Sequence, residues 1–402
     1  MPQSTSLQRI ADDLTAISGL EHLRIDEGCL SISPTNTEEI AAILRCASKY
    51  RIAVTPFGGG TKQSWGNATK PALTLRTHRL NTLREHTWED MTCTVEAGCV
   101  WASMQSSLAT HGQFVALDPL WPGRATVGGI VATNDSGNLR LRYGSLRNLI
   151  IGMTIVLADG TVARSGGKVV KNVAGYDLHK LMTGAFGTLG IITQVTFRLH
   201  SIPRHEQTFT ISSRDVRLLG RLLMKILDSS LSTQSLQLCS SDSGFHLDAR
   251  LATLPEVIQD QTATLTRFAA SIDLEVSPAD ADVWNARQEV FNQATSFIIK
   301  ATMLPSDISL FTAIIHELGG TSVTQGTGIM TASIPVSASS QLLHFREKLE
   351  ATRGSLAILH QPIPVDTAVF STPLDTLPLM REIKHRFDPN RILNPERFVG
   401  GI

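Results

Sequence analysis

Three glycine clusters hold the residues whose types and spacing point to chemistry. They are Gly58-Gly59-Gly60-Thr61-Lys62, Thr126-Val127-Gly128-Gly129 and Gly187-Thr188-Leu189-Gly190, and 19 of the 30 glycines fall between Gly58 and Gly190. Glycine permits positive φ and lets another group approach its backbone amides. Because each cluster adjoins an apolar run, we expect main-chain N–H groups from all three to surround one long anionic ligand.

The first cluster has the composition of a phosphate-binding loop. It follows a predicted buried strand, residues 52–56, so its amides can converge on a pyrophosphate, and Lys62 can neutralise a phosphate as a point charge. A plain tight turn does not need three consecutive glycines. A Rossmann dinucleotide site is disfavoured, because no helix-forming run follows Gly58-Gly59-Gly60.

The other two clusters extend this ligand surface. Thr126, Gly128 and Gly129 bring a second stretch of amides, and residues after each cluster offer short polar side chains or accessible backbone. The further candidates are Asn134, Ser136, Gly137, Gly190, Ile191 and Ile192.

Composition limits the class of protein. The 402 residues predict two domains or one domain with a large insertion, and 42% hydrophobic with 18% charged residues predicts a substantial core. With 36 basic and 36 acidic residues the formal net charge is zero. This balance argues against a nucleic-acid binder, which usually shows a basic excess.

Cysteine usage and the N-terminus indicate a cytoplasmic protein. The five cysteines are odd in number and form no C-x-x-C, which favours reduced thiols, although a Cys93–Cys99 disulfide stays open. No compact set of four thiolates exists, so an iron–sulfur cluster would belong to a partner chain. No signal peptide is evident, and the longest apolar run, about residues 149–158, is too short to span a bilayer. Membrane association would therefore be peripheral or through a partner.

The first ~200 residues read as mixed α and β structure with many short strands. The Thr35-x-x-Glu38 spacing of a capping box opens a helix, and Asp159-Gly160 is a hairpin signal. We expect strands near residues 52–56, 73–75, 93–96, 150–158, 162–164 and 191–199, and a helix over residues 100–111 that Gly112 stops.

After Pro203 the pattern changes to two successive blocks of βαββα type. This order predicts one antiparallel sheet with helices on one face, and it is compatible with tandem ferredoxin-like halves. We expect strands near 208–211, 236–238, 245–247, 297–301, 330–334 and 356–359, helices over 216–227, 256–272, 306–318 and 337–352, and a short helix within 380–398.

In their order, these motifs resemble the vanillyl-alcohol-oxidase or PCMH-type FAD-binding family. The resemblance rests on the Pro-Phe-Gly-Gly-Gly-Thr loop, Ala125-Thr126-Val127-Gly128-Gly129, Arg142-Tyr143-Gly144-Ser145, Gly187-Thr188-Leu189-Gly190-Ile191-Ile192-Thr193 and the tail Phe387-Asp388-Pro389 with Ile392-Leu393-Asn394-Pro395. Within the family, Lys171-Asn172-Val173-Ala174-Gly175-Tyr176-Asp177-Leu178 is similar to the FAD-binding E subunit of bacterial glycolate oxidase.

The resemblance implies an α+β fold with a two-part PCMH-type FAD-binding domain and a ferredoxin-like α+β cap. The implied domains are residues 1–205 (FAD-binding), 206–365 (cap and substrate) and 366–402 (returning to the FAD domain). Non-covalent FAD is expected, because residues 56–70 contain no histidine where this family attaches the flavin. The implied FAD-binding residues are Phe57, Gly58, Gly59, Gly60, Thr61, Lys62, Thr126, Gly128, Gly129, Asn134, Ser136, Gly137, Gly190, Ile191 and Ile192.

Two cations are candidates for binding a substrate carboxylate. Related D-2-hydroxyacid dehydrogenases place an arginine after a tryptophan and a lysine on the following strand, and Arg287 after Trp284 and Lys300 occupy similar points. Those enzymes also carry a His-x-Gly-x-Gly-x-x-His-like run and a Glu-His pair that hold a metal. This chain lacks both, so no metal site is expected, and His316, His344 and His360 are scattered.

The implied activity is oxidation of the CH–OH group of a 2-hydroxy acid by an FAD-dependent oxidoreductase. The resemblance favours the FAD-binding subunit of a glycolate oxidase complex, which forms glyoxylate and passes electrons through flavin to an iron–sulfur partner beside a sister flavoprotein. Two alternatives remain open. One is a stand-alone D-2-hydroxyacid dehydrogenase, for example for D-lactate, and the other is a non-catalytic FAD relay or assembly subunit.

Overall fold

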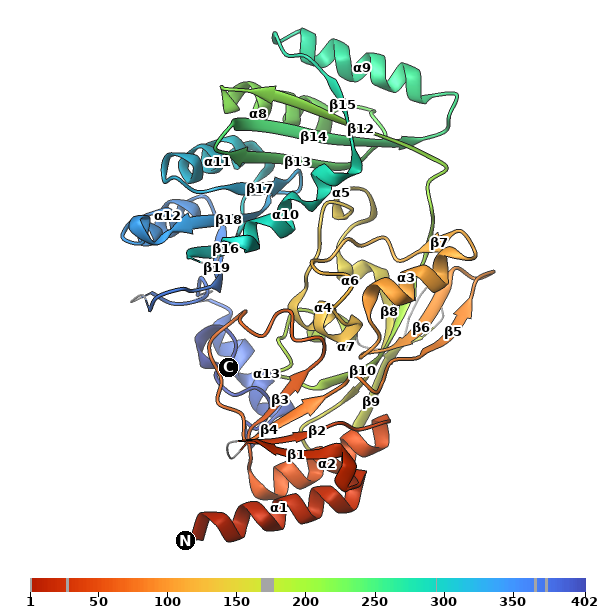
Figure 1. Ribbon diagram of the computed structural model, residues 1–402, viewed down its shortest axis with the longest axis vertical. Coiled ribbons are helices and arrows are strands. Elements are labelled where there is room, and N and C mark those ends of the chain that lie inside the picture. Colours follow the sequence, from red (N-terminus) through yellow and green to blue (C-terminus); the bar gives the residue numbers. More distant parts are fainter. Residues whose placement is uncertain (1, 27–28, 168–176, 294, 365–366, 373–374) are drawn as a thin grey trace. The chain divides into compact units, whose positions relative to one another are not determined.

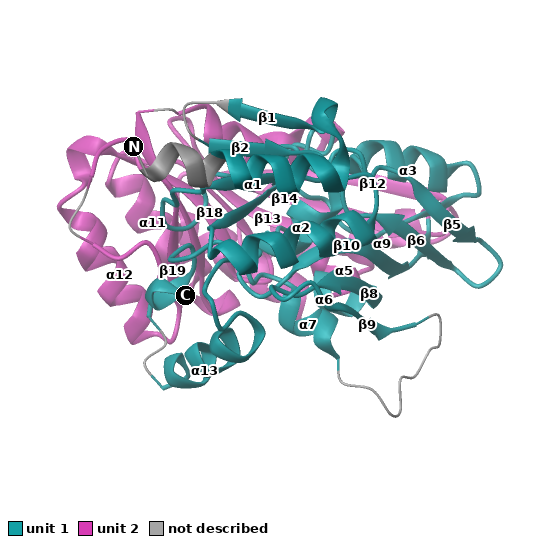
Figure 2. Cartoon of the chain, turned by 90° about the horizontal axis from the view of Figure 1, so that it is seen from below, with its two compact units in different colours: residues 1–135, 145–201, 372–402 teal, residues 136–144, 202–371 magenta. Residues whose placement is uncertain are grey.

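The computed structural model describes residues 2–26, 29–167, 177–293, 295–364, 367–372 and 375–402. Figure 1 shows the elements, and Figure 2 colours the two compact units of the chain. Unit 1 comprises Met1–Asp135, Ser145–Ser201 and Thr372–Ile402, and unit 2 comprises Ser136–Gly144 and Ile202–Ser371. The predicted α+β class is confirmed. The segment 136–144, expected in the first domain, belongs to unit 2.

Unit 1 begins with a four-stranded sheet of order β1-β2-β4-β3, in which β2, β4 and β3 run parallel. Two helices cover it and share its core, which includes Leu14, Ile40, Leu44 and Val54. The elements are α1 (Pro2–Ser18), β1 (Leu23–Asp26), β2 (Cys29–Ile32), α2 (Thr37–Tyr50), β3 (Val54–Phe57) and β4 (Leu73–Arg76).

The start of α2 differs by one residue from the predicted capping box. Asn36 is the N-cap, and its side chain accepts the N–H of Glu39 at 2.8 Å. The Glu39 carboxylate in turn accepts the N–H of Thr35 at 2.9 Å. The cap is therefore Asn36 with Glu39 three residues later, not Thr35 with Glu38, because asparagine is at least as good a cap as threonine.

The second sheet of unit 1 is antiparallel, with order β5-β6-β10-β8-β9. Its predicted strands form, and the Asp159-Gly160 hairpin joins β8 to β9. The strands are β5 (Leu83–Thr87), β6 (Thr92–Glu96), β8 (Ile150–Val156), β9 (Val162–Gly166) and β10 (Ile191–Arg198), with a small pair β7 (Gln113–Phe114) and β11 (His200–Ser201). The helices are α3 (Trp101–Ala109), α4 (Val127–Thr133), α6 (Leu146–Leu149) and α7 (Leu178–Met182).

The C-terminal segment is built into unit 1 beside β3. The N–H of Val54 donates to Ile392 at 2.7 Å, and the N–H of Asn394 donates back to Val54 at 2.9 Å. Helix α13 (Leu377–Phe387) contributes Lys384, whose ammonium donates to Asp388 at 2.6 Å and to the carbonyl of Thr188 at 2.7 Å. Burial lowers the pKa of Lys384, and the Asp388 carboxylate opposes that shift.

Unit 2 is one eight-stranded antiparallel sheet of order β15-β12-β14-β13-β17-β18-β16-β19. The first half contains β12 (His205–Ser213), α8 (Val216–Leu227), β13 (Thr233–Ser241), β14 (Gly244–Thr253), α9 (Ile258–Ala270) and β15 (Ser277–Ala279). The second contains α10 (Ala286–Glu289), β16 (Ser296–Thr302), α11 (Ile308–Glu317), β17 (Ser322–Gln325), β18 (Ile329–Pro335), α12 (Gln341–Ala351) and β19 (Ser355–His360), and α5 (Arg140–Tyr143) joins the unit from the 136–144 segment. Strand β17 was not predicted.

The two faces of this sheet differ in chemistry. Alternate residues such as Leu236, Leu238 and Ile299 pack with helices α8, α11 and α12 in one apolar core. The residues between them point to the opposite face, and there Gln237 and Asp248 are fully buried polar groups. We call this second surface, with its buried polar side chains, the polar face.

Two further sequence-based expectations concern membranes and thiols. Among the described residues, no helix combines the length and the apolar character needed to cross a bilayer. All five cysteines are free, so the Cys93–Cys99 disulfide is not formed. Burial raises the pKa of the Cys93 thiol to about 12.

Candidate functional site

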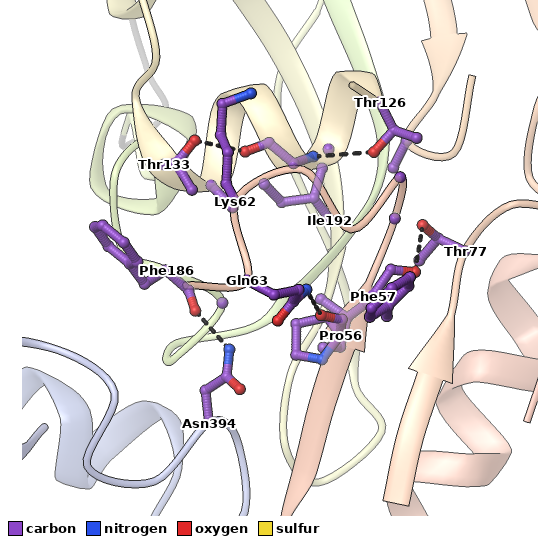
Figure 3. A pocket seen from close by; sticks show the side chains of 18 of the residues that line it. Pro56, Phe57, Lys62, Gln63, Thr77, Thr126, Thr133, Phe186, Ile192 and Asn394 are labelled. Atoms are coloured by element: carbon purple, nitrogen blue, oxygen red, sulfur yellow. Dashed lines mark hydrogen bonds between the residues drawn. The ribbon is translucent and has the colours of Figure 1, made fainter. Parts of the chain in front are cut away.

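A cavity in unit 1 brings the three glycine clusters together. It encloses about 840 Å³ of empty space, open solvent at its mouth included, which is in the range of small-molecule sites. Its walls come from the loop after β3, the start of α4, the turn before β10 and the C-terminal tail (Figure 3). All the predicted FAD-binding residues line it except Asn134, Ser136 and Gly137.

The first glycine loop presents a run of unpaired backbone donors. Among the described residues, the N–H groups of Gly58, Gly59, Gly60 and Thr61 donate to no protein acceptor. Gly60 has a φ of 71°, which turns the loop in a way that suits glycine. Successive amides of this kind form an anion-binding concavity. These residues therefore fit the pyrophosphate of a dinucleotide.

The second cluster contributes shape rather than donors. The N–H of Val127 donates to Cys99 at 3.0 Å, and the N–H of Gly128 donates to Ala97 at 2.7 Å. The N–H of Gly129 lies 3.4 Å from the Oγ1 of Thr126, the N-cap of α4. The expectation that this cluster offers amides to the ligand is thus wrong for Gly128, whose N–H group is bonded to a neighbouring loop, while the N–H of Gly129 faces the cap of its own helix.

Close packing of the two loops explains why they need glycine. A Cβ atom on Gly59 would lie 1.9 Å from the carbonyl oxygen of Arg124, and one on Gly58 would lie 2.2 Å from Oγ1 of Thr126. A Cβ on Gly129 would approach no described atom closer than 3.3 Å. Substitution at Gly59 therefore disturbs the loop itself, whereas Gly129 is a position where the ligand alone can be tested.

The Lys62 ammonium pairs with a carboxylate of the protein, whereas the sequence predicted a phosphate of the ligand. Its ammonium lies 3.1 Å from the Asp135 carboxylate, and the two side chains are 4% and 1% exposed. The rings of Trp65 and Trp121 lie 5.5 and 5.3 Å from the same ammonium. Figure 3 shows this side chain directed away from Pro56. The cavity therefore receives the backbone of Lys62, while its charge is neutralised within the protein.

The C-terminal tail supplies cavity residues that the sequence interpretation did not assign. Asn394 donates from Nδ2 to the carbonyl of Phe186 at 2.7 Å (Figure 3). Its Oδ1 is buried and has no hydrogen-bond partner among the residues that the structure describes. Arg397 donates to the carbonyl of Gln63 at 2.5 Å and so fixes the end of the glycine loop. The Asn394-Pro395 motif was the available signal. A buried acceptor facing a cavity calls for a ligand donor or water.

Three residues that were predicted to bind the cofactor do not line the cavity. Asn134 is the C-cap of α4 with a φ of 47°. Ser136 and Gly137 belong to unit 2, and the carbonyl of Ser136 accepts hydrogen bonds from Arg287 at 2.6 Å and from Gln325 at 3.0 Å. Their predicted contact with FAD has no support from the cavity.

The two substrate candidates lie in unit 2 and differ in setting. Arg287 on α10 is 7% exposed, and its bond to Ser136 gives it a positioning role for the 136–144 segment. Lys300 lies on β16 opposite Thr331 of β18, on the polar face between core residues Ile299 and Ala301. Of the motif Lys171–Leu178, which carried the likeness to the E subunit, residues 171–176 lie outside the described residues.

Comparison with known proteins agrees with this geometry. Residues 30–166 match the family model described as FAD binding domain. The chain is 25% identical to the mitochondrial D-lactate dehydrogenase (cytochrome) of Arabidopsis thaliana, over 92% of this chain and 73% of that protein. It is 33% identical to the glycolate oxidase subunit GlcD of Bacillus subtilis, over 51% of this chain and 44% of the subunit. The chain thus spans less than half of that subunit.

Solved structures share the fold. The 4-ethylphenol oxidase of Gulosibacter chungangensis superposes with a TM-score of 0.75 at 16% identity, covering 98% of this chain and 97% of its own. A p-cresol methylhydroxylase gives a TM-score of 0.73 at 14% identity, covering 98% and 96%. With the glycine-lined cavity and the matched FAD domain, these findings show that the chain is an FAD-dependent oxidoreductase with a PCMH-type FAD-binding domain, similar to D-lactate dehydrogenases and to a glycolate oxidase subunit.

Proposed function

We propose that this chain is the FAD-binding subunit of a glycolate oxidase complex that converts glycolate to glyoxylate. The observation that carries its cofactor role is the run of amides from Gly58 to Thr61 at the cavity, which have no acceptor in the described part of the chain. The match to a glycolate oxidase subunit supports the substrate class. A sister flavoprotein and an iron–sulfur subunit are the partners we propose, because this chain has no cysteine set for a cluster.

Non-covalent FAD would be held mainly by backbone groups. The amides of residues 58–61 would bind the pyrophosphate, and Asn394 Oδ1 would accept a hydrogen bond from the cofactor. Ile191 and Ile192 begin β10 and line the cavity, where their backbone would border the flavin or adenine. Bound FAD would supply the acceptor for the hydride that leaves the substrate carbon.

The substrate carboxylate needs a cation, and we propose Lys300 for it. Lys300 is half-buried on the polar face, so it stands in a setting where a carboxylate pair is stronger than in bulk water. Arg287 acts through its bond to the Ser136 carbonyl, as a positioning residue. Oxidation of glycolate removes a hydride, which carries both electrons, from the carbon and a proton from the hydroxyl group.

A stand-alone D-2-hydroxyacid dehydrogenase is the second candidate. It is favoured by the alignment with the Arabidopsis thaliana D-lactate dehydrogenase, which extends over 92% of this chain. The glycolate assignment differs in needing partner subunits for electron transfer. A flavin relay without substrate chemistry is the third reading, and it differs from both in having no direct reaction with a hydroxy acid.

The visible spectrum of the purified chain, before and after anaerobic glycolate or D-lactate, separates these candidates. Bound flavin that glycolate bleaches supports direct oxidation by this chain, and bleaching by D-lactate alone supports the second candidate. Flavin that stays oxidised with both, but is reduced when the sister flavoprotein is added with glycolate, supports the relay. A folded chain that takes up no FAD, with or without partners, contradicts all three.

The FAD site itself is tested with a variant that spares the loop packing. Gly129→Asp places an anion in the cavity with little steric cost, and Gly129→Asn is its uncharged control. We expect FAD affinity to fall at least ~10-fold in the aspartate variant alone, about 1.4 kcal/mol. Equal affinities in the two variants would show that no phosphate lies near Gly129.

A further inference from the structure

Three side chains of types that can ligate a metal lie together on the polar face of unit 2, and none of them is assigned to the cofactor or the substrate above. Cys239 lies on β13 directly opposite His246 on β14, and Asp248 follows two residues later on the same face. Their ligand atoms Sγ, imidazole N and carboxylate O all lie within 4.8 Å of one another. We infer that Cys239, His246 and Asp248 form a binding site for a divalent cation of Zn²⁺ type, independent of the proposed function.

Two of the three distances between ligand atoms are close to those of a tetrahedral metal site. His246 Nε2 lies 3.6 Å from Asp248 Oδ2, and Cys239 Sγ lies 3.9 Å from the same oxygen. Zinc–ligand bonds of ~2.0–2.3 Å in tetrahedral geometry place neighbouring ligand atoms about 3.3–3.8 Å apart. A small contraction of the three side chains would therefore bring all of them to a common ion.

The charge on Asp248 gives a physical reason for a cation here. Its side chain is fully buried, and its ion-pair partner among the described residues is His246, which is charged only when protonated. A buried carboxylate is costly unless it is paired or binds a metal. The mixed set of thiolate, imidazole and carboxylate suits Zn²⁺ or Co²⁺ better than Mg²⁺ or Ca²⁺, which prefer oxygen ligands.

Neighbouring groups hold the carboxylate in position. Thr210 donates to Asp248 Oδ1 at 2.5 Å, and Gln237 donates from Nε2 to Oδ2 at 2.9 Å. Gln237 is fixed in turn by the carbonyl of Val283 at 2.8 Å and by Asn138, which donates to its Oε1 at 2.8 Å. Such outer hydrogen bonds orient metal ligands and raise their affinity.

One of the three proposed ligands, His246, reaches the surface. The His246 side chain is 30% exposed, and it borders a surface hollow that Ser212, Ser213, Arg214 and the β13–β14 turn also line. Arg214 is a cation at this rim, so uptake there is not helped by charge. Three protein ligands leave a fourth coordination position, which water or a ligand atom can take.

The test is Co²⁺ titration of the FAD-loaded full-length chain, followed by difference spectroscopy on the red side of the flavin absorption. We expect one equivalent of Co²⁺ to give tetrahedral d–d bands, and Zn²⁺ to displace it. Cys239→Ser and His246→Gln should abolish the bands, whereas the control variants Cys29→Ser and His344→Gln should keep them. Thr210→Val should weaken binding by ~10-fold, because it removes the outer hydrogen bond to Asp248.

Retained FAD and an unchanged circular dichroism spectrum show that each variant is folded. A second readout is the thermal midpoint, which excess Zn²⁺ should raise in the wild type and not in His246→Gln, since a ligand stabilises only the state that binds it. Tetrahedral bands of equal strength in folded Cys239→Ser, or no Co²⁺ binding by the folded wild type, would overturn the assignment.

Discussion

The two units bury charge in different ways. Unit 1 neutralises it in complete ion pairs, such as Lys384 with Asp388 at 2.6 Å and Lys62 with Asp135 at 3.1 Å. Unit 2 buries Asp248 against an amide, a hydroxyl, a thiol and the His246 ring. The pairs of unit 1 are closed structural contacts, whereas the carboxylate of unit 2 retains capacity for a cation.

The largest expected effect on stability comes from removing one partner of a buried ion pair. Lys384→Met leaves Asp388 buried without its counter-ion, and we expect a loss of about 3–5 kcal/mol in the free energy of unfolding. Lys49→Met removes an exposed pair with Asp13 and should cost under ~1 kcal/mol. Denaturant unfolding, followed by release of FAD, measures both. Equal costs would show that burial of the pair does not matter.

The same substitution at the two buried carboxylates sharpens the comparison. Asp388→Asn leaves Lys384 as an uncompensated buried charge and should cost about 3–5 kcal/mol. Asp248→Asn in metal-free protein should cost under ~1.5 kcal/mol, because Gln237 can still donate to the amide oxygen and the Thr210 hydroxyl can rotate to accept. Chemical denaturation of both variants in chelator is the measurement. A larger loss of unfolding free energy for Asp248→Asn than for Asp388→Asn would contradict the view that only unit 1 buries carboxylates in complete ion pairs.

A buried histidine of unit 1 provides a pH-dependent test. Burial lowers the pKa of His179 below the ordinary histidine value of 6.5, although the nearby Asp177 carboxylate opposes this shift. Below pH 6.5 the unfolded chain binds a proton at this histidine, whereas the folded chain binds it only at a lower pH. The free energy of unfolding therefore decreases as the pH is lowered below 6.5, by at most about 1.4 kcal/mol per pH unit.

Unfolding free energies measured between about pH 7 and pH 5 check this slope. His179→Gln should flatten it, and the exposed His344 is the site of the control variant, His344→Gln. The interpretation fails if both variants keep the wild-type slope.

The smallest expected effect concerns FAD affinity after the Lys62 pair is removed. The double variant Lys62→Met with Asp135→Leu takes out both charges, so neither is left unpaired. If backbone amides bind the pyrophosphate, the FAD dissociation constant should change by under about threefold, or ~0.7 kcal/mol. Flavin fluorescence titration measures it. A dissociation constant that rises 100-fold or more in a folded variant would show that the Lys62 ammonium does bind a phosphate of FAD.

Local patterns predicted much of unit 1 and of its cavity. Glycine runs beside apolar strands identified the loop from Gly58 to Lys62 and the start of β10, because the backbone requirements of such loops are local. Helix α8 has the predicted bounds, Val216–Leu227, since its apolar periodicity is strong. The α2 cap was wrong by one residue because Thr35 and Asn36 both offer a capping oxygen.

Long-range pairing was beyond the sequence patterns. The partner of Lys62 is Asp135, and the partners of the Ser136 carbonyl are Arg287 and Gln325, all far away along the chain. The triad on the polar face depends on the register of β13 against β14, which sets Cys239 opposite His246. A scan for metal-ligand spacing does not detect a site that strand pairing assembles from both sides of a turn.

The 136–144 segment affects how this protein can be dissected. The fragment 202–371 would contain the whole eight-stranded sheet and could be cloned as a separate piece. It would lack Asn138 and the Ser136 carbonyl, however, so Gln237, Arg287 and Gln325 would each lose a hydrogen-bond partner. Unit 2 therefore consists of two separate stretches of the chain. An isolated unit 2 should include the nine residues 136–144, either joined by a linker or added as a peptide.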